Sequence, residues 1–255
     1  MKRLRITNIS ARFGITLLVV GLSLLQTNKE PKADEQSADY VLAVTWQPAF
    51  CEGAGERPEC RSQTKDRFDA ANLTLHGLWP QPRDNWYCGV TKQMRQTDEL
   101  NRWQELPRLE LSSSLRSELK EKMPGYVSDF HRHEWVKHGT CMPGKTSPQT
   151  YFQSSLDLLD QLNASEFTGL LRKYIGAKLT TLEMKEVFSD VFGQGAGKRL
   201  VVRCKRDGNR KLIFGFRIFL RGDLQVEKGL AQLIQNSQSS GRSCRDGLVD
   251  PVGLQ

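Results

Sequence analysis

The sequence predicts a single α+β domain, and three observations support this class. The run Tyr40–Trp46 is β-branched and aromatic, which is typical of a buried strand. A strand–turn–strand pattern lies near the other end of the chain, and the helical patterns between them do not alternate with strands. The 255 residues are 38% hydrophobic and 26% charged, a globular composition that argues against a disordered or fibrous chain.

A second strand and five helices are predicted in order along the chain. Residues 72–75 form a short strand that ends in a loop rich in Gly and Pro. Pro124 ends the first helix, and Thr180 with Glu183 forms a capping box at the start of the last. The helical spacing places the five helices at residues 111–123, 130–138, 150–162, 166–174 and 181–192.

A β-hairpin follows, with strands at residues 199–206 and 210–221 around the turn-forming triplet Asp207-Gly208-Asn209. Alternation on its second strand separates an apolar face from a basic face. The stretch 198–221 holds nine basic residues and one acidic residue, so it carries much of the positive charge of a chain whose net charge is +8. The basic face is either solvated or a track for an RNA backbone. The apolar face comprises Leu212, Phe214, Phe216, Ile218 and Leu220, and the basic face comprises Lys211, Arg217 and Arg221.

The amino terminus has the pattern of a secretory leader. Basic residues precede an apolar run at residues 13–25, which is shorter than the roughly 20 residues needed to cross a bilayer. We therefore expect a signal peptide over residues 1–27, a polar linker over 28–39 and one domain over 40–255. An uncleaved interfacial anchor is the alternative for the first segment.

The six Cys residues are even in number and contain no C-x-x-C pair, which disfavours zinc ribbons and thioredoxin-like motifs. Export places them in an oxidising compartment, where three disulfides are expected. The residues themselves favour only Cys51–Cys60, which would close a short polar loop, and other pairings stay open.

All four histidines fall in two short segments. His76 lies in the first, and three of the four lie within eight residues in the second. In the predicted helix 130–138, spacings of three and four residues crowd a carboxylate, an ammonium and two imidazoles onto one side, where they would shift one another's pKa values. A surface salt-bridge cluster is the structural alternative. The crowded side chains are His133, Glu134, Lys137 and His138.

Two other chemistries are disfavoured. His133 and His138 are five residues apart, about 140° around a helix, and Lys137 would repel a cation, so no metal site is expected. No Ser sits in a G-x-S-x-G elbow, and every Cys is expected to be bridged. What remains is histidine acid–base chemistry beside a cation. RNA supplies its own nucleophile, the 2′-hydroxyl, which DNA lacks.

Two segments resemble the active-site segments of the ribonuclease T2 family: Leu75-His-Gly-Leu-Trp-Pro80 and His133-Glu-Trp-Val-Lys-His-Gly-Thr-Cys141. The resemblance covers the chain from about Tyr40 to the carboxyl end. It implies an α+β fold with a central antiparallel sheet. It also implies cleavage of single-stranded RNA through a 2′,3′-cyclic phosphate, without a metal or cofactor.

The resemblance also implies a role for each residue of the two segments. His138 would be the base for the 2′-hydroxyl, and His76 the acid for the 5′-oxygen leaving group. Glu134 and Lys137 would stabilise the pentacovalent phosphorus, and His133 would help hold the phosphate. His131 is outside the motif and is given no role.

Further pairings and contacts follow from the family pattern. It implies disulfides Cys88–Cys141 and Cys204–Cys244, which leaves Cys51–Cys60 for the local loop. Gln81 stands where many relatives carry a base-reading Asp, so an adenine preference does not follow and a broad base preference is expected. Three aromatic residues are candidates to stack a base, with core or rim packing as the alternative: Trp79, Trp86 and Tyr87.

RNA is thus the expected partner of a monomer that acts in the periplasm or after secretion. No obligatory protein partner, and no membrane contact after leader removal, is expected. The alternative function is a catalytically silent RNA-binding or inhibitory relative. Such a relative would be expected to have lost one of the paired histidines, whereas His76 and His138 are both present.

Overall fold

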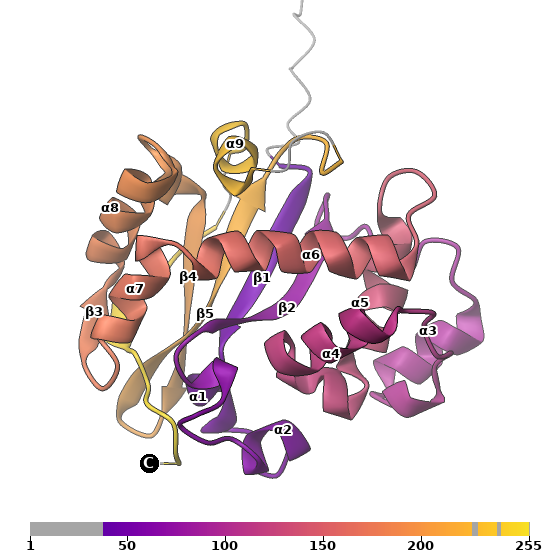
Figure 1. Cartoon of the computed structure of the whole chain (residues 1–255), viewed down its shortest axis with the longest axis horizontal. Coiled ribbons are helices and arrows are strands. Elements are labelled where there is room, and N and C mark those ends of the chain that lie inside the picture. Colours follow the sequence, from indigo (N-terminus) through magenta and orange to yellow (C-terminus); the bar gives the residue numbers. More distant parts are fainter. Residues whose placement is uncertain (1–37, 226–228, 239–240, 255) are drawn as a thin grey trace, which may run out of the picture. The chain divides into compact units, whose positions relative to one another are not determined.

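The computed structural model describes residues 38–225, 229–238 and 241–254 (Figure 1). The expected signal peptide, and the expected linker up to residue 37, lie outside the described residues. Within the described part of the chain, no helix is both long and apolar enough to cross a membrane.

A six-stranded sheet organises the described domain. Its strand order is β2-β1-β5-β6-β3, and β4, which is not on this path, also pairs with β5. All pairings are antiparallel except the short one between β5 and β6, so the expected antiparallel sheet is confirmed apart from that pair. The strands are β1 (Tyr40–Trp46), β2 (Leu73–Pro80), β3 (Lys178–Thr180), β4 (Leu200–Asp207), β5 (Arg210–Leu220) and β6 (Asp246–Leu248).

The five helices predicted from the sequence correspond to α4 through α8. Side-chain caps explain where they start: Ser112 accepts a hydrogen bond from a backbone N–H of α4, Ser147 does so for α6, and Thr180 with Glu183 forms the expected capping box of α8. Four further helices, α1, α2, α3 and α9, had no prediction. The helices are α1 (Gln47–Cys51), α2 (Pro58–Arg61), α3 (Lys92–Glu99), α4 (Ser113–Lys122), α5 (Phe130–Lys137), α6 (Pro148–Asn163), α7 (Glu166–Lys173), α8 (Thr181–Phe192) and α9 (Leu230–Gln235).

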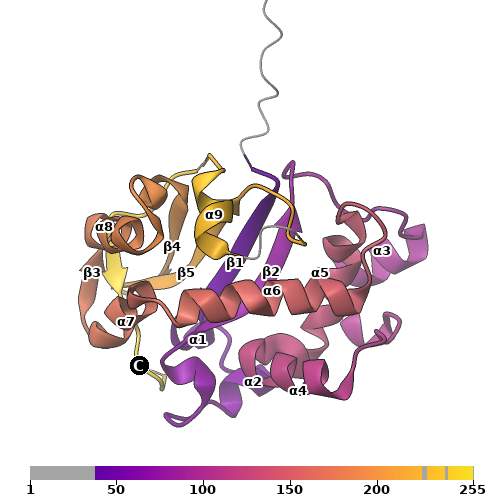
Figure 2. The same ribbon diagram turned by 45° about the horizontal axis from the view of Figure 1, so that its top comes forward.

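Helix α6 crosses one face of the sheet, and both views show it running over the central strands (Figures 1 and 2). Its inward side chains, including Tyr151, Phe152 and Leu159, are fully buried in the main core. Burying large aromatic and aliphatic side chains supplies most of the favourable free energy of folding. The Tyr151 hydroxyl also accepts a hydrogen bond from the backbone N–H of Leu78, at 3.2 Å, which ties α6 to β2.

Strand β2 continues through the segment that was expected to be a loop. It pairs with β1 as far as Pro80, which lies opposite Tyr40, and a register shift lets the chain bulge around His76. Gly and Pro are tolerated here because β2 is an edge strand that pairs only with β1. His76 is therefore held by the sheet, and the prediction that it lies on a loop is wrong.

The predicted alternation on β5 holds only in part. Ile213 and Phe219, expected on the polar face, are buried, whereas Phe214 is half-buried against Phe50. The register shift between Arg203 and Cys204 leaves Phe214 without an opposing residue on β4, which interrupts the alternation. Phe219 is buried because it packs in a second small cluster with Val41 and Val201.

Three disulfides join the described cysteines, and they are the pairs that the family pattern implies. Cys88–Cys141 spans 53 residues and links the loop after β2 to the segment after α5. Beside it, the backbone N–H of Tyr87 donates to the carbonyl of Lys137 at 2.9 Å. The Cys88–Cys141 disulfide and this hydrogen bond therefore hold the two motif segments together. The other pairs are Cys51–Cys60 and Cys204–Cys244.

Removing Cys88–Cys141 is expected to cost stability and activity together. In the chain-entropy model, a 53-residue loop contributes about 4 kcal/mol, against roughly 2 to 3 kcal/mol for the 9-residue loop of Cys51–Cys60. Urea unfolding of the two paired Cys→Ala variants measures the difference. Equal losses of stability, or full RNA cleavage by the Cys88→Ala/Cys141→Ala variant, would contradict this role.

Candidate active site

A buried carboxylate lies at the centre of the site. Glu134 of α5 has no exposed surface, and its Oε2 accepts a hydrogen bond from the indole N–H of Trp79 on β2, at 2.9 Å. Gly77 makes this approach possible, because a Cβ there would lie 1.9 Å from Glu134 Oε2. The Gly of the first motif therefore lets the helix carboxylate lie directly against the strand.

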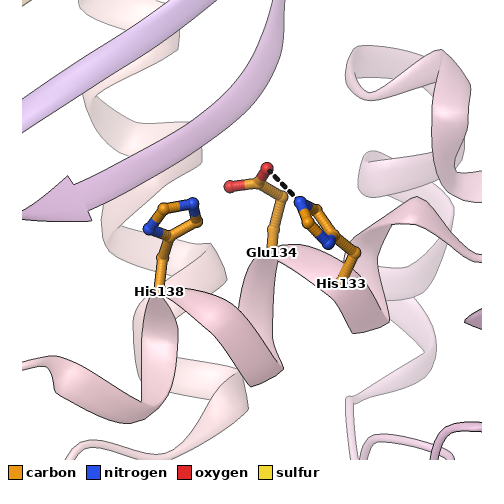
Figure 3. Close-up of side chains that lie close together, drawn as sticks. All are labelled: His133, Glu134 and His138. Carbon is orange, nitrogen blue, oxygen red and sulfur yellow. Dashed lines mark ion pairs between the residues drawn. The ribbon is translucent and has the colours of Figure 1, made fainter. Parts of the chain in front are cut away.

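The predicted catalytic histidines gather around this carboxylate. His76 Nε2 lies 3.6 Å from Glu134 Oε1, and His133 Nε2 lies 3.7 Å from the same oxygen. Figure 3 shows His133 and His138 on either side of Glu134, with the ion pair to His133 drawn. The ring of His138 stacks on Trp79, with centroids 5.3 Å apart. Glu134 Oε1 itself has no hydrogen-bond partner.

The side chains of His133 and His138 come closer together than the predicted separation of about 140° around a helix suggests. The helix ends at Lys137, and the backbone of His138 departs from ideal helix geometry at φ −115°. As a result, donor atoms of His133, Glu134 and His138 all lie within 4.8 Å of one another. This set is the one described cluster whose geometry a metal ion could use, which makes a direct test of metal dependence informative.

Burial sets the protonation of the cluster. It raises the pKa of Glu134 to about 7, an effect that the charges of His133 and Lys137 and the Trp79 hydrogen bond oppose. Burial also lowers the pKa of His138, helped by the neighbouring positive charges of His133 and Lys137. The pKa of His76 is lowered by burial and by His133, Arg217 and Lys137. Near neutral pH, His138 is therefore an unprotonated base.

Asp98 of α3 orients His133, and no sequence pattern predicted this contact. Its buried carboxylate lies 2.8 and 2.9 Å from His133 Nδ1 and accepts a hydrogen bond from the Tyr87 hydroxyl at 2.7 Å. Contact at Nδ1 leaves Nε2 of His133 facing Glu134. Because α3 was not predicted, and Asp98 is 35 positions from His133, only the tertiary structure joins them.

The three aromatic candidates for base stacking have different surroundings. Trp79 and Trp86 line the cleft, and Trp86 is 44% exposed. The Lys137 ammonium lies over the Trp86 ring, 4.9 Å from its centroid. Tyr87 packs away from the cleft, with its hydroxyl on Asp98 and the Arg95 guanidinium over its ring at 5.0 Å. Trp79 and Trp86 therefore line the cleft, and Tyr87 does not.

Two cavities meet at His76. The larger, about 580 Å³, is lined by the histidines and the glutamate of this cluster, and the smaller, about 220 Å³, is lined by His76, Phe130 and Trp103 among others. His76 keeps about one third of its side chain exposed, so a bound molecule can reach it. The larger cleft is lined by His76, Trp79, His133, Glu134, Lys137 and His138, and also by Arg83, Arg203, Arg217 and Arg242.

Only one residue of the predicted basic face, Arg217, reaches the cleft. Lys211 instead lies 3.4 Å from Asp246, and Arg221 is exposed and does not line the cleft. Arg83, Arg203 and Arg242 line the cleft without having been predicted. Arg203 lies on the first strand of the predicted hairpin, whose alternation was not considered, whereas Arg83 and Arg242 lie outside the hairpin and could not have been found from it.

The model of the ribonuclease T2 family matches residues 38–236, which is more than half of the chain. The chain is similar to ribonuclease I of Escherichia coli (strain K12), with 29% identity over 72% of this chain and 75% of the relative. It is also similar to ribonuclease 1 of Arabidopsis thaliana, with 24% identity over 76% of this chain and 79% of the relative.

Among solved structures, the SF11-RNase of Nicotiana alata superposes with a TM-score of 0.49 at 17% identity, covering 73% of this chain and 92% of that chain. The family match and the relatives identify the chain as an RNA endonuclease. The chain belongs to the ribonuclease T2 family.

His131 lies outside the cleft, and its burial predicts a pH effect on stability. The ring is buried and stacks on Tyr126, and burial, together with the charge of Arg132, lowers its pKa to about 4. Between pH 6.5 and about 4 the unfolded chain binds a proton here that the folded chain does not, so stability falls as the pH falls. The size of this contribution is roughly 3 kcal/mol.

The variant His131→Phe keeps the aromatic stack and removes the titration. We expect its free energy of unfolding to fall less steeply than that of the wild type between pH 6.5 and pH 4, as measured by denaturant titration. Parallel curves for the two proteins would show that His131 does not titrate in this way.

Proposed function

We propose that the chain cleaves single-stranded RNA by attack of the 2′-hydroxyl on the adjacent phosphodiester, without a metal ion. His138 takes the proton of the 2′-hydroxyl as the new O–P bond forms. His76, protonated beside the Glu134 carboxylate and the anionic phosphate, which both favour its imidazolium form, gives a proton to the 5′-oxygen as that oxygen's bond to phosphorus breaks. The products are a 2′,3′-cyclic phosphate and a free 5′-hydroxyl. The observation that carries this proposal is the placement of His76 and His138 in one cleft around Glu134.

The remaining polar groups suit the charge that develops on phosphorus. The Lys137 ammonium, which lines the cleft, offsets negative charge on the non-bridging oxygens. Glu134 has a pKa raised to about 7 and an Oε1 without a partner, so its protonated form can donate a hydrogen bond to the same group. His133, held by Asp98, offers Nε2 to the phosphate.

The two cavities that share His76 suit the two nucleosides flanking the scissile phosphate. In the larger cleft, Trp86 offers an exposed ring on which a base can stack, whereas the Trp79 ring already contacts His138 and Arg217. Stacking on an indole accepts every base because every base has a π-face. Gln81 also lines this cleft, and with an amide in place of the family's Asp we propose a broad base preference.

The disulfides and the leader pattern bear on where the protein acts. Three disulfides and a basic, apolar leader pattern support action in the periplasm or after secretion, with residues 1–27 removed. We propose that the catalytic domain, residues 40–255, acts on RNA as a monomer.

Incubation with RNA and with DNA in excess chelator tests the reaction class. We expect full cleavage of RNA and none of DNA, because the nucleophile belongs to RNA and His138 needs no ion to act as a base. Because the donor atoms of His133, Glu134 and His138 converge, the chelator directly tests whether a metal ion held there is needed for cleavage. Loss of activity on chelation, restored by a single divalent ion, would overturn the mechanism.

Substrates with different leaving groups separate the two histidines. On a dinucleotide, His76→Ala and His138→Ala should each lose about 10²–10⁴ in rate. On a nitrophenyl phosphodiester of a 3′-nucleotide, His76→Ala should keep most of its activity, because nitrophenolate leaves without a proton. His138→Ala should stay impaired, since the 2′-hydroxyl still needs a base.

His131→Phe is the matched control, because His131 lies outside the cleft. Its turnover of both substrates should equal that of the wild type. Rescue of His138→Ala, instead of His76→Ala, by the nitrophenyl substrate would reverse the two roles. Near-normal activity of both alanine variants would refute acid–base catalysis by this pair.

A further inference from the structure

The cleft holds a second group of cations beyond the catalytic cluster. Arg83 follows β2, Arg203 lies on β4, Arg217 lies on β5 and Arg242 precedes β6, and all four line the same cavity as His76 and His138. Within the described parts of the chain, none of the four guanidinium groups has a carboxylate partner or a hydrogen bond.

In the described chain, the other half-buried arginines donate hydrogen bonds or form ion pairs through their guanidinium groups. Arg67 binds Asp69 and Arg132 binds Asp129, each through an ion pair shorter than 3 Å. Arg217 is also half-buried, yet its neighbours are cations: burial lowers its pKa, and the charges of Arg203 and Arg83 lower it further. Such repulsion is unfavourable in the empty protein and is relieved when an anion binds among the arginines.

The position of the group relates it to the catalytic residues. The Arg217 guanidinium lies 5.2 Å from the centroid of the Trp79 ring, and the same ring stacks on His138 at 5.3 Å. Arg217 and His138 therefore both lie against the Trp79 indole. In the proposed reaction the scissile phosphate lies between His76 and His138, which leaves the guanidinium groups for a different anion.

The surface beneath the arginines is apolar. Val41 of β1 and Phe219 of β5 line the cleft there, and both belong to a small buried cluster against which Trp79 packs. An apolar floor with guanidinium groups around it suits a ribose or base flanked by phosphate. The planar fork of a guanidinium also matches two phosphate oxygens at once.

We propose that Arg83, Arg203, Arg217 and Arg242 form a subsite for a second phosphate of the same RNA strand, next to the scissile one. This inference rests on the proposed cleavage of RNA and adds a reason for the enzyme to prefer polymers over dinucleotides. The ligand is a phosphodiester in RNA, or a terminal phosphate in a short substrate.

Three dinucleotides test the subsite: one without a terminal phosphate, one with a 5′-phosphate and one with a 3′-phosphate. For the wild type we expect one of the two terminal phosphates to raise kcat/KM about tenfold, the size of a charge-assisted phosphate contact. In Arg203→Gln/Arg242→Gln, whose two positions are exposed, the ratio should fall close to one. The slope of log(kcat/KM) against log salt should become shallower in the same variant.

Arg206→Gln is the matched control, because Arg206 lies exposed on β4 but does not line the cleft. Its ratio should equal that of the wild type. A wild type that gains nothing from either terminal phosphate, or a gain that survives in Arg203→Gln/Arg242→Gln, overturns the subsite. Thermal unfolding of each variant checks that the fold is kept.

A binding arm keeps the inference separate from catalysis. Dissociation constants for the three dinucleotides made with 2′-deoxyribose, which cannot be cleaved, should show the same tenfold gain and the same loss in Arg203→Gln/Arg242→Gln. If RNA dinucleotides are not cleaved at all, the proposed function fails, while the deoxy ligands still decide the subsite. If cleavage is normal and no terminal phosphate helps, the subsite alone is refuted.

Discussion

The contact on which the site depends is the close approach of the Glu134 carboxylate to β2. It requires a residue without a side chain at Gly77, and it is completed by the Trp79 N–H. Burying a carboxylate is costly unless it is paired and hydrogen-bonded, so the groups around Glu134 are constrained to stay near it. His76 and His133 each lie within 4 Å of the same oxygen of this carboxylate.

The rest of the fold supports this contact from several directions. Helix α6 is fastened to β2 through Tyr151, and Cys88–Cys141 links the loop after β2 to the chain after α5. Asp98 on α3 fixes the ring of His133. Positions held by packed helices and covalent bonds cost little further entropy when substrate binds, which suits the proposed reaction, with its two proton transfers across one phosphate.

Much of the architecture could be predicted, and each failure has a physical cause. Helices α4 to α8 and strand β1 follow from apolar spacing and end signals. The Gly and Pro after Leu75 predicted a loop, but an edge strand tolerates both, so β2 carries His76. Ideal helix angles separated His133 from His138, but the helix ends between them. Tyr87 was a candidate to stack a base, yet its hydroxyl is taken by Asp98.

The sequence by itself determined which chemistry was available: two motif histidines, a glutamate and a lysine at short spacings, six cysteines, and a helix that carries the glutamate and the lysine. Spacing of this kind is local, so helix periodicity and motif patterns could reveal it. Only the tertiary structure decided that Asp98 meets His133 and that arginines from four separate segments line one cleft with His76. Those contacts join residues far apart along the chain, and sheet pairing and core packing, not local sequence, set the distances between them.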